Sequence, residues 1–333
     1  MPHPRPRTSP RPRSRVIVWA HPDQEDLIRE AIEVAQLELI AVASDRREGA
    51  SVLSEAFGVE RLGDLRDAIQ HPDLDVLWLA APLPIEAQER KLIRESGHPA
   101  LSLEPRPGEI AALCKQPEDA DTARFIPLLR RSEAFQNLQQ MLQDAAPPHS
   151  LSLSFRGRPE HGTLFARLFD AMDLIDHLCG DVESVSASLA IPEFDAHAPA
   201  PRVPDSLFNL HGHMSVNFNF AENRCASAVL SNVSDSWFRG VTMLSETGSL
   251  RLTDRECHWR GAPDEMASFT DPEPITAGRL VGESIRRRLD NLDHDVHPPN
   301  FPRLLALCEA ARLSCRTGQA ESPSRMLAML SHV

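Results

Sequence analysis

The sequence contains no tyrosine, and its lysines are limited to Lys91 and Lys115. Nearly all of its basic residues are arginines, which do not release a proton at working pH. A reaction mechanism that needs a lysine or a tyrosine as proton donor therefore has at most two candidates in this chain.

Long hydrophobic runs and paired cysteines are also missing. No stretch of about 18 apolar residues is present to cross a membrane, and the N-terminus lacks the apolar segment of a secretory signal. The six cysteines form no CxxC pair and lie at positions 114, 179, 225, 257, 308 and 315. We therefore expect reduced, mostly buried thiols in a cytoplasmic protein that holds no metal.

Positive charge is scarce outside the N-terminus. The formal net charge is -13, which argues against nucleic acid as a general partner because phosphates need a basic surface. The first fifteen residues differ, since they hold five arginines, five prolines and no acid. We predict a disordered arm over residues 1–14, either a variable extension or a contact to an acidic partner or RNA.

Short apolar runs alternate with helical periodicity over residues 15–130, which we assign to a first domain. Strands are predicted at 15–20, 37–43, 75–80, 99–103 and 124–129. Helices are predicted near 27–35, 48–57, 62–70 and 84–96. This alternation is typical of a doubly wound parallel sheet of the Rossmann type.

The pattern changes over residues 131–333, which we assign to a second α/β domain. Helices are predicted at 132–144, 163–179 and 301–316, and the segment 262–300 is polar and partly helical. Strands are predicted at 150–157, 182–190, 211–221, 224–231, 237–245 and 249–253. Short turns between successive strands, such as Thr247-Gly248, indicate a large, mostly antiparallel sheet.

Several motifs along the chain carry a family resemblance. They are residues 41–46 (AVASDR), 57–59 (FGV), 71–76 (HPDLDV), 180–187 (GDVESVSA) and 309–318 (EAARLSCRTG). In this order and spacing they resemble the Gfo/Idh/MocA family, the glucose–fructose oxidoreductase and inositol dehydrogenase group. The resemblance implies a Rossmann-type domain and an α/β domain, NAD(P)-dependent oxidoreductase activity, and a homo-oligomer assembled through the large sheet.

The positions that this family uses for the dinucleotide depart from its pattern. The resemblance assigns ribose binding to Asp45 with Arg46 nearby, with helix capping by Asp45 as the alternative. The family's G-x-G-x-x-G/A turn is matched by Ala20, Pro22 and Glu25. Glycines let the backbone approach a pyrophosphate, whereas Pro22 has no N–H to donate and acidic side chains repel phosphates. We therefore expect no cofactor, and NAD(P) is implied by the resemblance alone.

The catalytic positions of the family are altered as well. Its lysine is matched by Glu104, the histidine after its Thr-Pro turn by Glu86, and its Asp/His pair by Ala166 and Asp170. We expect Glu86, Glu104 and Asp170 to converge on the interdomain cleft. Clustered carboxylates raise one another's pKa and act as acid/base groups or bind a cation; the alternative is a solvated acidic cleft without function.

Two histidine clusters resemble metal-ligand spacing only in part. His211-Gly212-His213 places two imidazoles on one face of a predicted strand, and residues 293–297 (DHDVH) form a second polar cluster. A metal site needs further ligands that neither cluster supplies within sequence reach. We therefore interpret these histidines as sheet-facing or interior residues and predict no metal.

The altered positions lead to a hypothesis of lost catalysis. We predict an oxidoreductase-like protein that binds a small molecule in the interdomain cleft, or a protein partner, and acts as a regulatory or structural subunit. The alternative is an active NAD(P)-dependent oxidoreductase on a sugar or polyol, with a rebuilt site in which Glu104 or Asp170 carries the proton.

Overall fold

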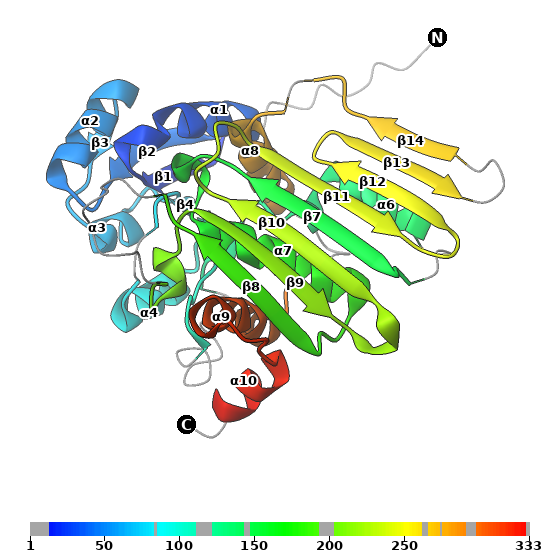
Figure 1. Cartoon of the computed structure of the whole chain (residues 1–333). Coiled ribbons are helices and arrows are strands. Elements are labelled where there is room, and N and C mark those ends of the chain that lie inside the picture. The colour runs from blue at the N-terminus through cyan, green and yellow to red at the C-terminus, as the bar shows by residue number, and fades with distance from the viewer. Residues whose placement is uncertain are drawn as a thin grey trace, which may run out of the picture.

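The computed structural model describes residues 13–82, 85–110, 122–142, 147–192, 203–261, 266–273, 275–290 and 298–330. Within these ranges the chain forms a six-stranded sheet and an eight-stranded sheet, each with helices packed against it (Figure 1). The predicted α/β fold class is confirmed. The predicted arm lies outside the described residues, except for Arg13 and Ser14.

The first sheet is parallel throughout, in the order β3-β2-β1-β4-β5-β6. Its strands are β1 (Arg15–Trp19), β2 (Glu38–Ala43), β3 (Glu60–Arg61), β4 (Val76–Leu79), β5 (Ala100–Ser102) and β6 (Arg124–Phe125). The connecting helices are α1 (Glu25–Ala35), α2 (Arg47–Phe57), α3 (Leu65–Ile69) and α4 (Ala87–Ser96). Val16 and Val18 of β1 enter one hydrophobic cluster and Ile17 and Trp19 the other, so both faces are covered, as a doubly wound sheet requires.

The second sheet has the order β14-β13-β12-β11-β7-β10-β9-β8, and only the β7–β10 pair among these is parallel. Its strands are β7 (Ser150–Arg156), β8 (Ser184–Ala190), β9 (His213–Asn219), β10 (Cys225–Ser231), β11 (Phe238–Leu244), β12 (Gly248–Thr253), β13 (Glu256–Gly261) and β14 (Met266–Thr270). The helices beside it are α6 (Glu133–Leu142), α7 (Leu164–Cys179), α9 (Phe301–Thr317) and α10 (Pro323–Leu330). α7 and α9 pack on one face, and α6 packs near β12–β14 (Figure 1).

The sequence does not predict β13, β14 or α10. In β13 only Cys257 and Trp259 point into the core, and the other residues of the strand are exposed or half-buried. Two inward residues are too few to distinguish a strand from a polar loop by periodicity. The predicted end of the last long helix is confirmed, because Gly318 caps α9 in the left-handed conformation with φ of 69°.

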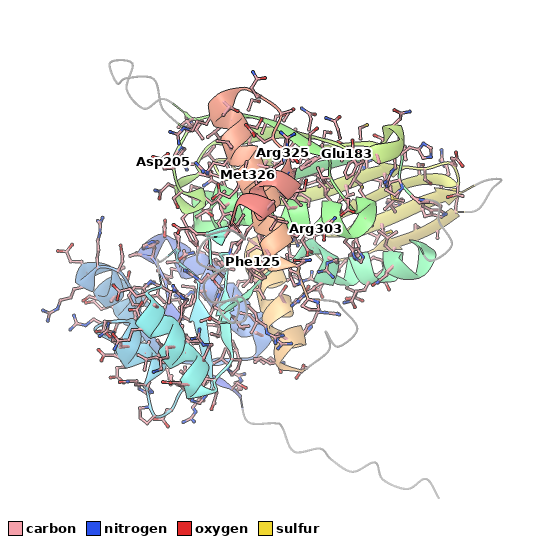
Figure 2. All side chains as sticks on the ribbon, turned by 90° about the horizontal axis from the view of Figure 1, so that it is seen from below. Phe125, Glu183, Asp205, Arg303, Arg325 and Met326 are labelled. Carbon is pink, nitrogen blue, oxygen red and sulfur yellow. The ribbon has the colours of Figure 1, made fainter. Side chains whose placement is uncertain are left out.

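The two domains meet just after β6. That strand ends at Phe125, although the sequence predicts it to residue 129, because Pro127 has no N–H for a neighbouring strand. The ring of Phe125 packs edge-on against Phe169 of α7, with centroids 5.5 Å apart. Figure 2 labels Phe125 at this junction. The first sheet therefore runs directly into the core of the second domain.

One helix from late in the chain returns to the first domain. α8 (Ala277–Leu289) packs along α1, and its Ala277, Val281 and Ile285 join the hydrophobic cluster of the first sheet. The helices approach closely at Gly282, where a Cβ would lie 2.6 Å from the carbonyl oxygen of Ala31. The boundary predicted at residue 130 thus lies between the two sheets. The segment after this boundary nevertheless contributes α8 to the first domain. No helix among the described residues is long and apolar enough to span a bilayer.

Candidate site between the domains

The turn after β1 is closed by a buried glutamine. Gln24, at the end of a 3-10 turn that begins with Pro22, is 2 % exposed. Its Nε2 donates to the carbonyl oxygens of Ala80 and Glu160, both at 3.0 Å, and its Oε1 accepts from the backbone N–H of His21 at 3.0 Å. Glu160 belongs to the second domain. One side chain therefore ties the first turn, the end of β4 and the second domain together.

Asp45 and Arg46 lie at the carboxyl end of β2, as predicted. Asp45 Oδ1 is 3.4 Å from His21 Nδ1, and the side chain of Arg46 is 84 % exposed. A cavity of about 430 Å³ opens here, lined in part by Pro22 and Val52. Asp45 does not cap α2, because the N-cap residue of that helix is Arg46. The capping alternative is therefore wrong, and Asp45 stays available to a ligand.

Glu104 is sealed between the domains. It is fully buried just after β5, where Oε1 accepts from the backbone N–H of Thr163 at 2.8 Å and Oε2 from its hydroxyl at 2.5 Å. The same hydroxyl caps α7 by accepting from the N–H of Ala166 at 3.2 Å. Burial raises the pKa of Glu104, while the two bonds from Thr163 oppose that shift. The carboxyl thus holds a helix N-terminus in place.

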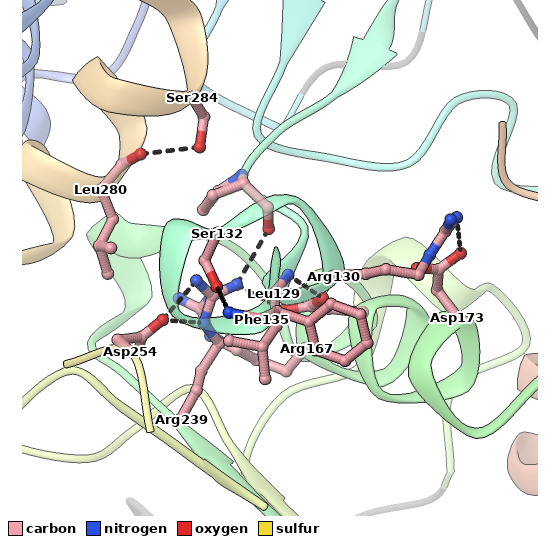
Figure 3. Close-up of polar contacts among 12 residues, drawn as sticks. Leu129, Arg130, Ser132, Phe135, Arg167, Asp173, Arg239, Asp254, Leu280 and Ser284 are labelled. Atoms are coloured by element: carbon pink, nitrogen blue, oxygen red, sulfur yellow. Dashed lines mark hydrogen bonds and ion pairs between the residues drawn. The ribbon is translucent and has the colours of Figure 1, made fainter. Parts of the chain in front are cut away.

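Asp170 is buried in α7 and held from two sides. It accepts from the backbone N–H of Leu129 and from Arg239 Nη1, both at 2.8 Å. Arg239 also donates to Asp254 and to the carbonyl oxygen of Pro127 (Figure 3). Burial raises the pKa of Asp170, and the nearby guanidinium lowers it. Asp170 therefore belongs to a closed ionic network.

Two further buried arginines surround this network. Arg130 forms a two-bond pair with Asp173 at 2.7 and 2.9 Å (Figure 3). Arg167 lies over the ring of Trp237, 4.1 Å from its centroid, and donates to the carbonyl oxygen of His161 at 2.8 Å. Burial and the neighbouring guanidinium of Arg167 lower the pKa of His161 to about 4. No local sequence pattern points to the Arg130–Asp173 pair or to the stacked Arg167.

Glu86 does not join the other two carboxyl groups. It is the N-cap residue of α4, its side chain is 74 % exposed, and its carboxylate is 3.8 Å from Arg66. Glu104 and Asp170 are buried with separate partners, as described above. The expected convergence of these three side chains on one open cleft is therefore wrong. Their burial is the physical reason, because each inner carboxyl is fixed by donors from its own surroundings.

A cavity of about 500 Å³ lies beside Arg106 and is lined by residues from both domains. Its walls include Pro82, Ile85, Arg90, Arg106, Phe208 and Asn209. Arg106 is 4 % exposed, and it donates to Ser102 Oγ at 3.0 Å and to the carbonyl oxygen of Ala81 at 3.3 Å. Burial lowers its pKa to about 10. No sequence motif points to Arg106, although residues just beyond the carboxyl ends of strands are where open α/β sheets bind ligands.

Comparison with solved structures identifies the architecture. An oxidoreductase from Agrobacterium radiobacter, in complex with NAD+, L-tartaric acid and magnesium, superposes with a TM-score of 0.68 at 13% identity, covering 94% of this chain and 99% of that one. The levoglucosan dehydrogenase complex with NADH and L-sorbose gives 0.69 at 14% identity, covering 93% and 98%. The WlbA dehydrogenase of Bordetella pertussis, with NADH and UDP-GlcNAcA, gives 0.61 at 16% identity, covering 93% and 98%. The chain has the Gfo/Idh/MocA-type fold.

The similarity to these proteins is one of three-dimensional structure, and comparisons of the whole sequence do not detect it. No family model and no curated protein matches the sequence. At 13% to 16% identity, the Gfo/Idh/MocA-type neighbours establish the fold of this chain and leave its chemistry to be argued from its own residues.

The dinucleotide that these neighbours contain does not fit the turn after β1. Pro22 has no N–H for a phosphate, and its ring fills the space over Gly49, where a Cβ would lie 3.3 Å from the proline ring. Gln24 occupies the inner side of the turn with its carboxamide. Exposed Asp23 and Asp26 add negative charge at the start of α1. Asp45 lies at the carboxyl end of β2, the position to which the family resemblance assigns ribose binding.

The histidine pair does not form a metal site. His211 precedes β9 and lies 3.3 Å from Asn232 Nδ2, whereas His213 is exposed on the strand. Gly212 between them has φ of 114°, so the two imidazoles do not share an extended strand face. Within the part of the chain that the structure describes, no three ligand-type side chains are placed to hold a metal ion. Residues 293–297 lie outside the described ranges.

Proposed function

We propose that this protein is a ligand-binding member of the Gfo/Idh/MocA-type fold that works without a nicotinamide cofactor, as a regulatory or structural subunit. The bridge made by Gln24 carries this proposal. Its carboxamide joins Ala80 and Glu160 at the turn where a dinucleotide would place its pyrophosphate. Opening that turn would leave the donors and acceptors of the bridge without partners, which is costly when they are buried.

The buried carboxyl groups support the same proposal. A proton carrier must reach its substrate within hydrogen-bonding distance. Glu104 is bonded through both oxygens to Thr163, and Asp170 is bonded to Leu129 and Arg239. These contacts favour structural roles for both groups over proton transfer.

An active NAD(P)-dependent dehydrogenase acting on a sugar or polyol is the second candidate. Asp45 beside its cavity of about 430 Å³ favours it, and similar structures were solved with NAD+ or NADH. In this rival, the turn at Gln24 opens when the cofactor binds, and the bonds of Gln24 are exchanged for bonds to phosphate.

Cofactor titration separates the two candidates. NADH and NADPH are added to the full chain while tryptophan emission is followed, because Trp19 ends β1 beside the turn. Hydride transfer to NAD+ and NADP+ is followed at about 340 nm in separate assays with myo-inositol, glucose and levoglucosan. We expect no saturable quenching and no turnover. Saturable binding with turnover on any of these substrates would refute the cofactor-free proposal.

We further propose a cytoplasmic homo-oligomer assembled through the open face of the large sheet. The family resemblance motivates this proposal, and Val229 (58 % exposed), Leu244 (50 %) and Met266 (73 %) are large apolar side chains exposed on strands of that sheet. The described cysteines are free, in keeping with a reducing compartment. Light scattering coupled to size-exclusion chromatography tests the assembly, and a monomer at micromolar concentration would contradict it.

A further inference from the structure

The two edges of the large sheet differ in how they are covered. At the β8 edge, the N–H and C=O groups of Val185 bond to the backbone of Glu321 at 2.8 and 2.9 Å, and Ser314 Oγ accepts from the N–H of Ala187 at 2.9 Å. The chain itself therefore covers this edge. At the opposite edge β14 has β13 on one side, and no other strand of the described chain pairs with it (Figure 1).

The register of the ladder shows which backbone groups of β14 are open. The N–H of Asp271 donates to the carbonyl oxygen of Arg255 at 2.8 Å, and the bonds of an antiparallel pair fall on alternate residues. Counting back from Asp271, the backbone groups of Met266, Ser268 and Thr270 point away from β13. Their N–H and C=O groups form a row along the edge, and within the described residues no backbone group pairs with them.

The side chains of β14 do not protect this edge against pairing. Natural edge strands are commonly guarded by charged side chains, prolines or bulges. Residues 266–270 (MASFT) include no charge and no proline, and their register with β13 is continuous. The next residue, Asp271, is ion-paired with Arg279 at 2.8 Å. Ala267 and Phe269 are half-buried at the margin of the core, so an added strand would cover them further.

We propose that β14 pairs with β14 of a second copy of this chain, so that two large sheets join edge to edge around a two-fold axis at Ser268. In an antiparallel pair centred there, Ser268 lies opposite its own counterpart, and Met266 lies opposite Thr270 of the partner subunit. Each open N–H then meets an open C=O. Phe269 lies beside Ala267 of the partner subunit, in a pair whose side chains approach closely. One strand thus satisfies both sides of the contact, as a two-fold interface requires.

This edge contact is separate from the contact proposed for the open face of the sheet. It uses the backbone of β14 and leaves the outward side chains of the central strands β7, β10 and β11 free for the other contact. A short strand pair buries less than the roughly 1,200–2,000 Å² of a standard interface. We therefore expect a reversible association with a dissociation constant of about 10 μM.

Sedimentation velocity of the full chain from about 1 to about 200 μM measures this association. We expect the mass to double across that range. Ser268→Pro removes one outward N–H and leaves the bonds to β13 intact, whereas Ser268→Lys places two charges opposite each other on the axis. Both variants should abolish the doubling. Thr242→Lys, at an exposed position of β11 on the open face, is the matched control and should retain the doubling.

Engineered cysteines test the register. Ser268→Cys places two thiols across the axis with Cα atoms about 5.5 Å apart, a separation that a disulfide can bridge. Added oxidised glutathione should therefore link two copies, and non-reducing electrophoresis measures the linked fraction. Thr270→Cys is the matched control on the same strand, because Thr270 of the partner subunit lies about 13 Å along the strand from Thr270. It should link no more than the unaltered protein, in which Cys225 is exposed.

Three results would overturn the inference: a constant mass across the concentration range, the same association in Ser268→Lys as in the unaltered protein, or equal linking of Ser268→Cys and Thr270→Cys. Circular dichroism confirms that each variant is folded. An association lost in Thr242→Lys and kept in Ser268→Lys would assign it to the open face and refute the edge contact. The cofactor titration is independent of all these outcomes, so the proposed function stands or falls separately.

Discussion

Arg239 and Arg106 are both arginines buried near the junction of the domains, 1 % and 4 % exposed, yet their surroundings differ. Burial disfavours the charged form of both guanidinium groups. At Arg239 the carboxylates of Asp254 and Asp170 outweigh that effect and raise its pKa, whereas at Arg106 burial prevails and lowers the pKa to about 10. The comparison teaches that neighbouring carboxylates decide whether the pKa of a buried arginine is raised or lowered. We interpret Arg239 as a structural residue.

The largest expected effect comes from removing the neutralised arginine. Arg239→Met leaves Asp170 and Asp254 buried without their cation, and breaking a buried pair in this way costs about 3–5 kcal/mol. Urea denaturation at neutral pH measures the loss. Arg251→Met, at an exposed position on the neighbouring strand β12, is the control and should change stability by less than about 0.5 kcal/mol.

The corresponding change at the other arginine should cost much less. Arg106→Met removes the hydrogen bonds to Ser102 Oγ and to the carbonyl oxygen of Ala81, and it also removes the cost of burying the charged form of this side chain, so we expect a net loss of about 1 kcal/mol. The same denaturation experiment measures it. If Arg106→Met and Arg239→Met cost the same, the two arginines play the same structural role and the comparison fails.

The smallest effect is a pH dependence at Glu104. Burial raises the pKa of Glu104 above its ordinary value of 4.5, so the folded state holds its proton more tightly than the unfolded state. As pH rises above 4.5 the parent should therefore lose stability relative to Glu104→Gln, until the folded-state pKa is passed. Urea denaturation of both proteins from about pH 4.5 to about pH 8 gives the difference curve. A flat curve, or one that rises with pH, would contradict the shift.

The sequence was sufficient for the architecture because the first domain is built from short apolar strands between amphipathic helices. Residues 16–19 and 76–79 are buried on both faces of the sheet, and each forms a continuous apolar run that predicts a strand. β13 cannot be found in this way, because only two of its side chains point inward and the rest of the strand is exposed or half-buried. A local sequence pattern predicts a helix or a strand only where burial determines the residue type at several consecutive positions.

The sequence indicates which positions lie at the site, but not which groups they contact there. The family resemblance points to Glu104 and Asp170, and both lie at the junction of the domains. Their environment depends on Thr163, 59 residues from Glu104, and on Arg239, 69 residues from Asp170. Nothing in the local sequence signals these contacts, so a carboxyl group expected to line an open cleft is found sealed by donors from the other domain.

The return of α8 to α1 bears on how the chain acquires its structure during synthesis. The first sheet and α1 emerge early, but the face of α1 that receives Ala277, Val281 and Ile285 stays uncovered until those residues have been made. Contacts between residues so distant in sequence form late and expose apolar surface in the interval. The N-terminal domain is therefore completed only after α8 has been made, and a chain that stalls before α8 leaves this apolar face of α1 uncovered.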